Sequence, residues 1–318
     1  MNKKNLIVYI IGVIILIFII SKVGPSKLIE TLKSFNFKYL PLIIITLLSG
    51  YVLSAINTWI ICWPLKKISL INIIKYTFFT AFFAIFIPGK LADLLMIHFL
   101  KKEGLNMNQS TITVFFDKMI SLFVKVILGL VGAIFILKQF NFLFMGIPLI
   151  TLFIIILILL AVSSKKFMRF IKRYILRKYS SIWKGISKDL KNYKDKYKIY
   201  LGYNFFVTLI KSFFEALLFF LLFLSFGQHT NVIEIFFVFA LLSILILLAF
   251  PIGISGLGVR ELMGITIFST IGIDSAVVFN SFMLRITLIY MYNFGLFIKY
   301  HDELNILKKS KIWKKIRF

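Results

Sequence analysis

Two long apolar regions of this chain are broken in the middle by proline and glycine, and this feature limits the possible folds most. Region 70–100 contains "FIPGKLAD" and region 232–273 contains "FPIGISGLGVRE". Backbone that leaves the helix inside a bilayer exposes N–H and C=O groups, which are costly when unpaired, so it is tolerated only inside the protein or beside a water-filled cavity. Each region is therefore either one distorted crossing or a hairpin that returns to its own side.

Six further apolar runs are uninterrupted, at residues 5–21, 39–62, 112–137, 141–162, 201–226 and 275–298. Each is long enough to cross the roughly 30 Å hydrocarbon core as a helix. Hydrophobic residues make up 60% of the 318 residues, against about 45–50% in a soluble domain. We expect an all-α polytopic protein of the cell membrane. No small-residue cleavage site follows the first run, so we expect it to be kept as a helix.

The loops between the apolar runs differ in charge, and this difference predicts the topology. The segment 163–198 carries thirteen Lys and Arg against two Asp, and the tail from Lys299 is also basic. Positively charged loops face the cytoplasm, so this segment and both termini are predicted to be cytoplasmic. The turns 138–141 and 227–231 contain one basic residue between them and are predicted to face outside.

This topology places both ends of region 70–100 inside and both ends of region 232–273 outside. The two regions are then re-entrant hairpins that enter from opposite faces, and the chain is an inverted repeat of helix, hairpin and helix around about six full spans. Such repeats, with broken helices near the midplane, build the substrate sites of many secondary transporters. The basic stretch from Lys22 to Lys38 fits an outer face poorly, and we interpret it as an interfacial amphipathic helix.

We predict a single membrane domain over residues 1–318, which this topology divides into five segments. They are the first helix with the interfacial segment (1–38), the first half with its hairpin (39–162), the basic cytoplasmic linker (163–200), the second half with its hairpin (201–298) and the basic cytoplasmic tail (299–318).

The net charge of +26 does not indicate a nucleic-acid-binding protein, because the basic residues lie between apolar runs and form no aromatic-lined groove. Basic loops that face anionic lipid explain them better. The single Cys62 and three scattered His residues form no metal-binding pattern. Nucleotide-binding and hydrolase motifs are absent as well. We therefore predict no cofactor, no metal and no catalytic centre, and a transporter-like protein in place of an enzyme.

The residues at the two hairpin tips predict an anion site. Gly89 and Lys90 lie in the first tip, and Gly256, Gly258 and Arg260 lie in the second. Glycine permits positive φ and close backbone approach, and a half-helix that starts after such a tip points free N–H groups toward an anion. A phosphate headgroup suits this arrangement. The alternative is that the small residues only allow tight helix packing.

Charged residues inside apolar regions cost about 2.5–3.5 kcal/mol each at a helix centre and therefore mark a site. Asp93 and Glu261 accompany the basic tip residues. Arg285 has no opposite charge within one helical turn, so we expect it to pair with Glu261 or Asp93 and to couple the two halves. Secondary candidates are Asp117, Lys118, Lys211 and Glu215. An ion pair that only neutralises itself explains Lys211 and Glu215 equally well, and a boundary position explains Asp117 and Lys118.

Three motifs carry a family resemblance. They are Pro88, Gly89, Lys90, Ala92 and Asp93 in the first hairpin, Asp117 and Lys118 in the next helix, and Gly256, Gly258, Val259, Arg260 and Glu261 in the second hairpin. With them, nearly the whole chain resembles the flippase-like transmembrane family found as the membrane region of lysylphosphatidylglycerol synthases and as stand-alone proteins. Ala92, Asp93 and Lys118 stand where the family usually has Gly, Glu and Arg. We therefore expect altered substrate contact at the first hairpin.

The resemblance implies lipid translocation between leaflets. In the fused synthases this region is implied to move aminoacylated phosphatidylglycerol, and stand-alone members are implied to move lipid-linked intermediates such as polyprenyl-phosphate sugars. No aminoacyltransferase domain follows the last helix here, so we expect no lysyl-lipid synthesis by this chain. Lys90 and Arg260 are expected to hold phosphate, while Asp93 and Glu261 position these bases or contact a cationic or sugar headgroup.

The expected partners are an anionic phospholipid or lipid-linked substrate, membrane lipids at the basic linker, and either a second copy or an envelope-biosynthesis protein. Two other functions stay open. One is a non-transporting membrane subunit that anchors a biosynthetic enzyme through the linker. The other is a membrane glycosyltransferase, for which the sequence presents no catalytic carboxylate.

Overall fold

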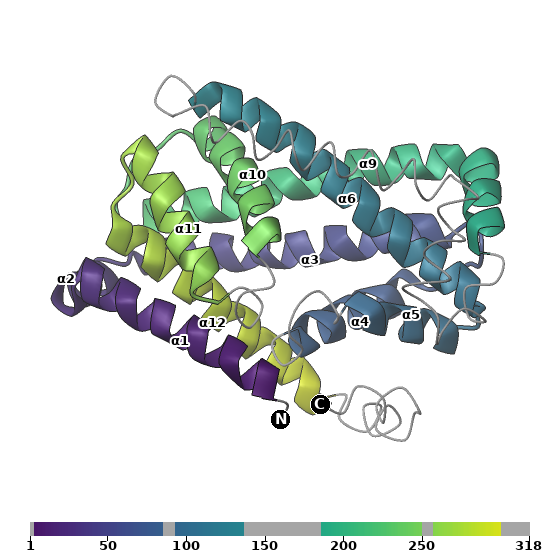
Figure 1. The fold of residues 1–318 in the computed structure, drawn as a ribbon, viewed down its shortest axis with the longest axis horizontal. Coiled ribbons are helices and arrows are strands. Elements are labelled where there is room, and N and C mark those ends of the chain that lie inside the picture. The colour runs from purple at the N-terminus through teal and green to yellow at the C-terminus, as the bar shows by residue number, and fades with distance from the viewer. Residues whose placement is uncertain (1–2, 85–92, 137–185, 250–256, 300–318) are drawn as a thin grey trace.

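The computed structural model describes residues 3–84, 93–136, 186–249 and 257–299, and within them the chain is all-helical (Figure 1). The helices are α1 Lys3–Val23, α2 Pro25–Lys33, α3 Leu40–Cys62, α4 Leu70–Phe83, α5 Asp93–Lys102, α6 Met107–Ile136, α9 Ile186–Ser225, α10 Val232–Ala249, α11 Val259–Phe268 and α12 Ser275–Lys299, with short 3-10 helices η1 Phe37–Tyr39 and η4 Ser269–Ile271.

Three helical segments in the described residues are long and apolar enough to cross a membrane: Phe37–Cys62, Asp189–Ser225 and Ser275–Phe294. A fourth is added if the pair α1–α2, which bends by 80°, counts as one span. Helices α1, α3, α6, α9 and α12 cover five of the six predicted apolar runs. The sixth run, 141–162, lies outside the described residues.

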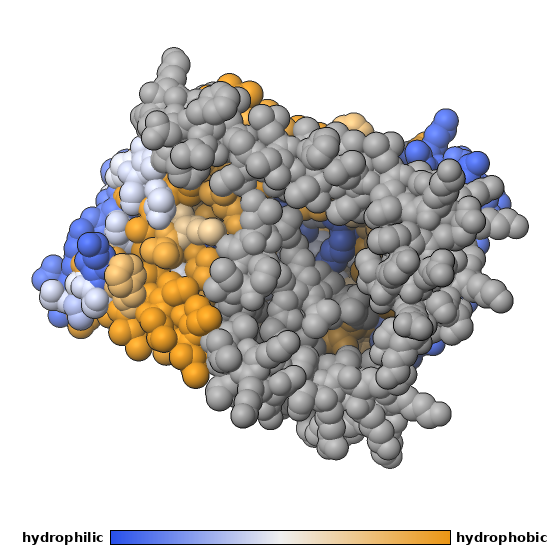
Figure 2. Space-filling model, in the orientation of Figure 1, coloured by the Kyte–Doolittle hydropathy of each residue, from blue (hydrophilic) through white to orange (hydrophobic). Residues whose placement is uncertain are grey.

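Large apolar side chains are exposed on the outer faces of these helices. Ile17 on α1, Ile45 on α3, Phe206 on α9 and Phe294 on α12 are each more than half exposed. Figure 2 shows hydrophilic residues at the two ends of the long axis, with hydrophobic residues between them over α1. This distribution is the one that a lipid environment favours.

The sharp bend between α1 and α2 is built by Gly24 and Pro25. Gly24 has φ 95°, and Pro25 begins α2, where its missing N–H costs no helical hydrogen bond. Leu28 is the buried residue of α2, and its carbonyl accepts a hydrogen bond from Asn280 Nδ2 of α12 at 3.0 Å. The predicted segment after the first run is therefore a separate short helix that is tied to α12.

One end of the bundle collects the end of α3, the end of α5, the start of α6 and the start of α9. Tyr193 Oη donates to the carbonyl of Ile61 at 2.7 Å, and Asn108 Nδ2 donates to Asp189 Oδ2 at 2.9 Å. The short basic turns 65–67 and 101–104, both predicted to be cytoplasmic, follow α3 and α5 and lie at this same end.

The opposite end collects α2, the end of α9 and the start of α12. The N–H of Asn36 donates to the carbonyl of Ser225 at 2.7 Å, and Lys27 forms an ion pair with Asp274. Helices α3 and α9 thus run antiparallel between the two ends, and their long contact forms the centre of the molecule.

The helices of the two interrupted regions start from opposite ends of this bundle. At the first end, Asn72 near the start of α4 donates to Glu103, just after α5, at 3.1 Å, so region 70–100 returns to the end from which it started. In region 232–273, α10 starts and η4 finishes at the opposite end. Helices α4 and α5, of 14 and 10 residues, are about 21 and 15 Å long, which is shorter than the hydrocarbon core.

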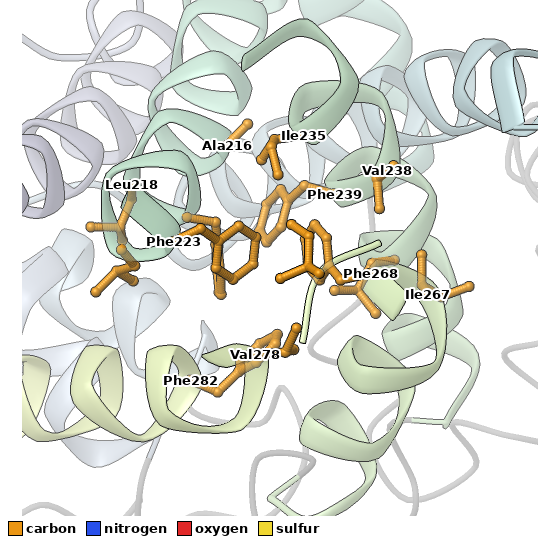
Figure 3. Packing of buried hydrophobic residues seen from close by; sticks show 14 of the residues in the cluster. Ala216, Leu218, Phe223, Ile235, Val238, Phe239, Ile267, Phe268, Val278 and Phe282 are labelled. Carbon is orange, nitrogen blue, oxygen red and sulfur yellow. The ribbon is translucent and has the colours of Figure 1, made fainter. Parts of the chain in front are cut away.

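The largest core packs α10 and α11 against α9 and α12 (Figure 3). The ring of Phe219 on α9 lies 4.7 Å from that of Phe282 on α12 and 5.0 Å from that of Phe239 on α10, measured between centroids. Phe268 of α11 packs against Phe223 of α9 at 4.9 Å. Aromatic pairs at these distances add to the free energy of burial, so this core holds the second broken region firmly in place.

The end of the predicted linker 163–200 is helical. Helix α9 begins at Ile186 and continues into the membrane span. Tyr197 interrupts the helical geometry with φ −122° and ψ 26°. Buried Leu190 and Tyr193 pack against α3 and α6 and hold this part of the segment as a helix.

Candidate functional site

The start of α11 is organised around the buried carboxylate of Glu261. Its Oε2 accepts a hydrogen bond from the N–H of Gly258 at 2.6 Å, and its Oε1 accepts two from Arg260, at 3.0 Å from Nε and 2.6 Å from Nη2. Glu261 is fully buried. A buried charge is stable only when it is paired and hydrogen-bonded. Arg260 and the N–H group at the start of α11 together compensate this carboxylate.

Gly258 is required at this position for two separate reasons. Its φ of 84° lies in the left-handed region, which L side chains rarely adopt. A Cβ here would also lie 2.6 Å from the carbonyl oxygen of Gly12 on α1. The glycine-rich tip therefore lets α11 begin against the middle of α1.

Two guanidinium groups lie over aromatic rings of the core. Arg260 lies 5.6 Å from the ring centroid of Phe282, and Arg285 lies 5.7 Å from that of Phe219. A guanidinium at this distance is attracted by the face of the ring. Two rings of the aromatic core, Phe282 and Phe219, therefore each have a cation beside them.

The expected direct ion pair between Arg285 and Glu261 is not formed. Glu261 is paired with Arg260 instead, and the Nε of Arg285 has no hydrogen-bond partner among the described residues. Arg285 does lie within electrostatic range of Tyr51, Glu215, Arg260 and Glu261. Glu261 is already satisfied by its neighbour Arg260 and by the N–H of Gly258 at the first turn of α11. The alternative partner, Asp93, has a side chain outside the described residues.

Glu215 on α9 finds its ion-pair partner on a different helix. Lys125 of α6 lies 3.5 Å from Glu215, whereas Lys211, one turn away on α9, lies within electrostatic range without a direct ion pair. The direct ion pair of Glu215 is therefore an interhelical one, and the alternative of an ion pair with Lys211 alone does not account for it. Because α6 packs closely on α9, the ammonium group of Lys125 lies within ion-pair distance of the Glu215 carboxylate.

These residues form one connected group, which we call the cationic cluster. It consists of Lys125, Lys211, Glu215, Arg260, Glu261 and Arg285 from helices α6, α9, α11 and α12. Within the described residues, four cations of the cluster face two carboxylates. Tyr51 of α3 lies within electrostatic range of Arg285, Glu215 and Arg260 and connects the cluster to the first half of the chain.

Asp117 of α6 belongs to a second, mainly uncharged group of polar residues. It is 6% exposed, and its two oxygens accept hydrogen bonds from Asn204 Nδ2 at 3.4 Å and Thr58 Oγ1 at 3.5 Å. Lys118 Nζ lies 3.8 Å away. The Asp117 carboxylate is therefore held by three neighbours, from α3, α6 and α9.

Two more residues complete this polar group. Asn204 also donates to the carbonyl of Asn57 at 2.8 Å, and Asn57 Nδ2 donates to Thr208 at 3.0 Å. Sequence reasoning missed Asn57, Asn204 and Thr208, because an uncharged polar residue in an apolar run does not stand out. Their signal is a helical one: Asn204 and Thr208 are four residues apart and so share one face of α9.

A cavity of about 140 Å³ opens beside Asp117, between α3, α4, α5 and α6. Its lining is rich in hydroxyl groups, from Tyr51, Ser54, Thr58, Thr77 and Thr80, and includes Asp117 and Lys118. Tyr51 thus touches the cavity on one side and lies near the cationic cluster on the other. Two of the secondary candidates, Asp117 and Lys118, lie at this cavity, and the other two, Lys211 and Glu215, lie in the cationic cluster.

The sequence was also compared with models of known protein families. Residues 5–294 match the family described as the lysylphosphatidylglycerol synthase transmembrane region. The chain belongs to this family. A search of curated proteins gave no match. The match extends from α1 to α12, so the cationic cluster and the cavity both lie within the family region of a multi-pass membrane protein.

The remaining predicted residues of this transmembrane-region family member lie outside the described residues. Gly89 and Lys90 of the first tip and Gly256 of the second belong to segments that the structure does not describe. Among the described residues, no group of three or more His, Cys, Asp or Glu is placed to hold a metal ion. The described parts of the candidate site are therefore the start of α11 with the cationic cluster and the cavity beside Asp117.

Proposed function

We propose that this protein moves an anionic lipid between the leaflets of the membrane and that the cationic cluster holds the phosphate during passage. The observation that carries the proposal is an excess of positive charge in the described part of the chain. Lys125, Lys211, Arg260 and Arg285 outnumber the cluster carboxylates Glu215 and Glu261. Asp117, which also lies within electrostatic range of Lys211, already has Lys118 beside it. Excess positive charge inside a membrane protein is costly. A phosphate that enters among these groups compensates it.

Arg285 is the cation of the cluster best suited to bind a ligand. Its Nε is buried and, within the described ranges of the chain, lacks a hydrogen-bond partner. An unsatisfied buried donor carries a desolvation cost that a ligand oxygen removes. Arg260, by contrast, already uses Nε and Nη2 on Glu261. A planar guanidinium can hold phosphate through two hydrogen bonds, so Arg285 is the expected primary contact.

The packing of the two halves supports a transporter architecture. Helices α3 and α9 pack on each other, α6 packs on α10, and α12 packs on α4. These contacts exchange equivalent elements of the two halves, as an inverted repeat with two re-entrant hairpins requires. In such folds, broken helices meet near a central substrate site, and rocking of the halves alternates access to it.

A vesicle assay with the purified full chain tests the proposal. The probe is acyl-labelled fluorescent phosphatidylglycerol in both leaflets, and a membrane-impermeant quencher reports which molecules reach the outer leaflet. We expect faster exposure than in empty vesicles. We expect Arg285→Gln to slow it by about tenfold or more, the equivalent of at least about 1.4 kcal/mol in the binding of the lipid.

The matched control is Lys33→Gln, which removes a cation from the exposed face of α2 and should leave the rate unchanged. Transport no faster than in empty vesicles, or full transport by both Arg285→Gln and Arg260→Gln, would overturn the proposal. The first of these outcomes would favour a non-transporting membrane subunit.

A further inference from the structure

We infer that the cavity beside Asp117 is a headgroup subsite that selects an uncharged, glycerol-sized polyol attached to the phosphate. This inference rests on the proposed function, because it places the phosphate of the same lipid at Arg285. It adds the chemical class of the headgroup, and it disfavours headgroups that carry an ammonium group.

The hydroxyl groups of the cavity present hydrogen-bond acceptors to a ligand. Thr77 Oγ1 donates to the carbonyl of Ile73 at 2.9 Å and Thr80 Oγ1 donates to that of Thr77 at 2.8 Å. Each hydroxyl has one donor and two acceptor lone pairs. With the donors used inside α4, the lone pairs remain available, and they suit a ligand that brings several O–H donors.

The charge balance at the cavity favours a neutral donor over a cationic one. Asp117 is its one described carboxylate, and Lys118 already lies 3.8 Å away. Asn204 and Thr58 also donate to this carboxylate. An incoming ammonium group would lose its hydration without finding an unpaired anion, which is unfavourable in a membrane interior. A hydroxyl group pays a much smaller desolvation cost.

The volume of the cavity is compatible with a small headgroup. A cavity of about 140 Å³ holds more than one water molecule, so a three-carbon polyol is a suitable occupant.

Tyr51 joins this cavity to the phosphate position. It lines the cavity and lies within electrostatic range of Arg285 and Arg260. Its ring is fixed by Phe78 of α4 at 4.9 Å between centroids. We therefore expect a phosphate at Arg285 to direct the next group of the headgroup toward Tyr51 and the hydroxyl-lined cavity.

The test measures binding of short-chain lipids to the full protein in detergent, by isothermal titration and by the shift in Tm. Dioctanoyl phosphatidylglycerol is compared with dioctanoyl phosphatidylethanol, which has the same charge and acyl chains but no headgroup hydroxyls. We expect tighter binding of the glycerol lipid by roughly threefold to tenfold, the range for one or two neutral hydrogen bonds. Thr77→Val should abolish this preference.

The matched control is Thr113→Val on α6. Thr113 is also buried and also donates to the carbonyl four residues earlier, at 3.0 Å, but it does not line the cavity, so this variant should keep the preference. If Thr77→Val does not fold, Ser54→Ala on α3 removes another lining hydroxyl with less change in packing.

Several outcomes would overturn the inference. The first is equal binding of the two lipids by the unaltered protein, which indicates a cavity filled only by water. The second is a preference for the glycerol lipid that survives both Thr77→Val and Ser54→Ala. Tighter binding of dioctanoyl phosphatidylethanolamine assigns the cavity to an ammonium group. Free glycerol phosphate that competes as well as the lipid assigns it to a soluble ligand.

Failure of this inference differs from failure of the proposed function. A binding preference without transport in vesicles leaves the subsite and removes the transport function. Transport with no preference between the two lipids, in binding or in rate, removes the subsite and leaves the transport function.

Discussion

Arg260 and Glu261 are neighbours in the sequence, and the guanidinium of Arg260 donates hydrogen bonds from both Nε and Nη2 to the carboxylate of Glu261. The same carboxylate caps α11 through the N–H of Gly258. One buried group thus stabilises the helix start and fixes the direction of a cation that lies over Phe282.

Glu261→Ala should lower stability by about 3–5 kcal/mol, the range for breaking a buried ion pair by removal of one partner. The variant leaves Arg260 without its anion and the N–H of Gly258 without its acceptor. Thermal unfolding in detergent measures the effect, and Glu30→Ala on the exposed face of α2 serves as the control. The double variant with Arg260→Ala should be more stable than Glu261→Ala alone, and the opposite order would contradict this interpretation.

Glycines at the contact of α6 and α10 should differ in their tolerance of alanine. A Cβ on Gly132 would lie 2.3 Å from the backbone oxygen of Phe237, whereas one on Gly129 would lie 2.2 Å from the flexible end of Ile244. Backbone cannot move aside as a side-chain end can. Gly132→Ala should therefore cost about 1–3 kcal/mol and Gly129→Ala less, while Gly202→Ala, with nothing within 4 Å, should be neutral or slightly stabilising. Equal melting temperatures for the Gly132 and Gly202 variants would count against this close packing.

A double-mutant cycle on Lys125 and Glu215 should reveal coupling of about 0.5–3 kcal/mol, the range for residues in one network. Glu215→Gln removes the carboxylate that faces Lys125, Lys211 and Arg285, so it should destabilise more than Lys125→Met. The double variant should lose less stability than the sum of the two single losses. Additive losses in detergent unfolding would show that the 3.5 Å ion pair contributes nothing.

The link between α2 and α12 should depend on pH in the acid range. Burial of Asp274 opposes its ionisation, but hydrogen bonds from Lys27 and from the N–H of Ala276 outweigh it, so the pKa of Asp274 lies below its ordinary value of 3.8. The folded protein therefore holds the proton less tightly than the unfolded chain. Stability from this group is complete above the ordinary value and is lost as the pH falls through the folded-state value.

Asp274→Asn tests this dependence, because asparagine can still cap α12. Above about pH 5 the variant should melt below the unaltered protein, and this difference should shrink as the pH falls toward the folded-state pKa. Both side chains are partly exposed, so the difference should be at most about 1 kcal/mol and should weaken with salt. A difference that grows on acidification would contradict the assignment.

Cysteine labelling tests the predicted orientation. In a Cys62→Ala background, Lys67→Cys and Lys102→Cys mark the two ends of the first hairpin, and His229→Cys and Ser269→Cys mark those of the second. All four positions are exposed. In intact cells an impermeant maleimide should label only the second pair. Labelling of one member from each pair would contradict re-entrant hairpins that enter from opposite faces.

The sequence alone predicted the helical class and the places where helices are interrupted. Long apolar runs can satisfy their backbone in a bilayer only as helices, and the Pro and Gly clusters at 88–89 and 251–258 predict where these helices stop. Residues 85–92 and 250–256 themselves lie outside the described residues. The glycine at position 258 was likewise predicted to allow a positive φ, and its φ of 84° confirms this. The bend at Gly24 and Pro25 was not predicted.

Only the tertiary structure decided which charged residues meet. Glu261 pairs with Arg260, Glu215 pairs with Lys125 of another helix, and Arg285 lies over Phe219. Residue spacing gives the face of a helix, but the rotation and depth of packed helices set the partner across an interface. Asn57, Asn204 and Thr208 show the same limit. They carry no charge, and they become a site only because α3 and α9 pack in a register that brings their side chains together.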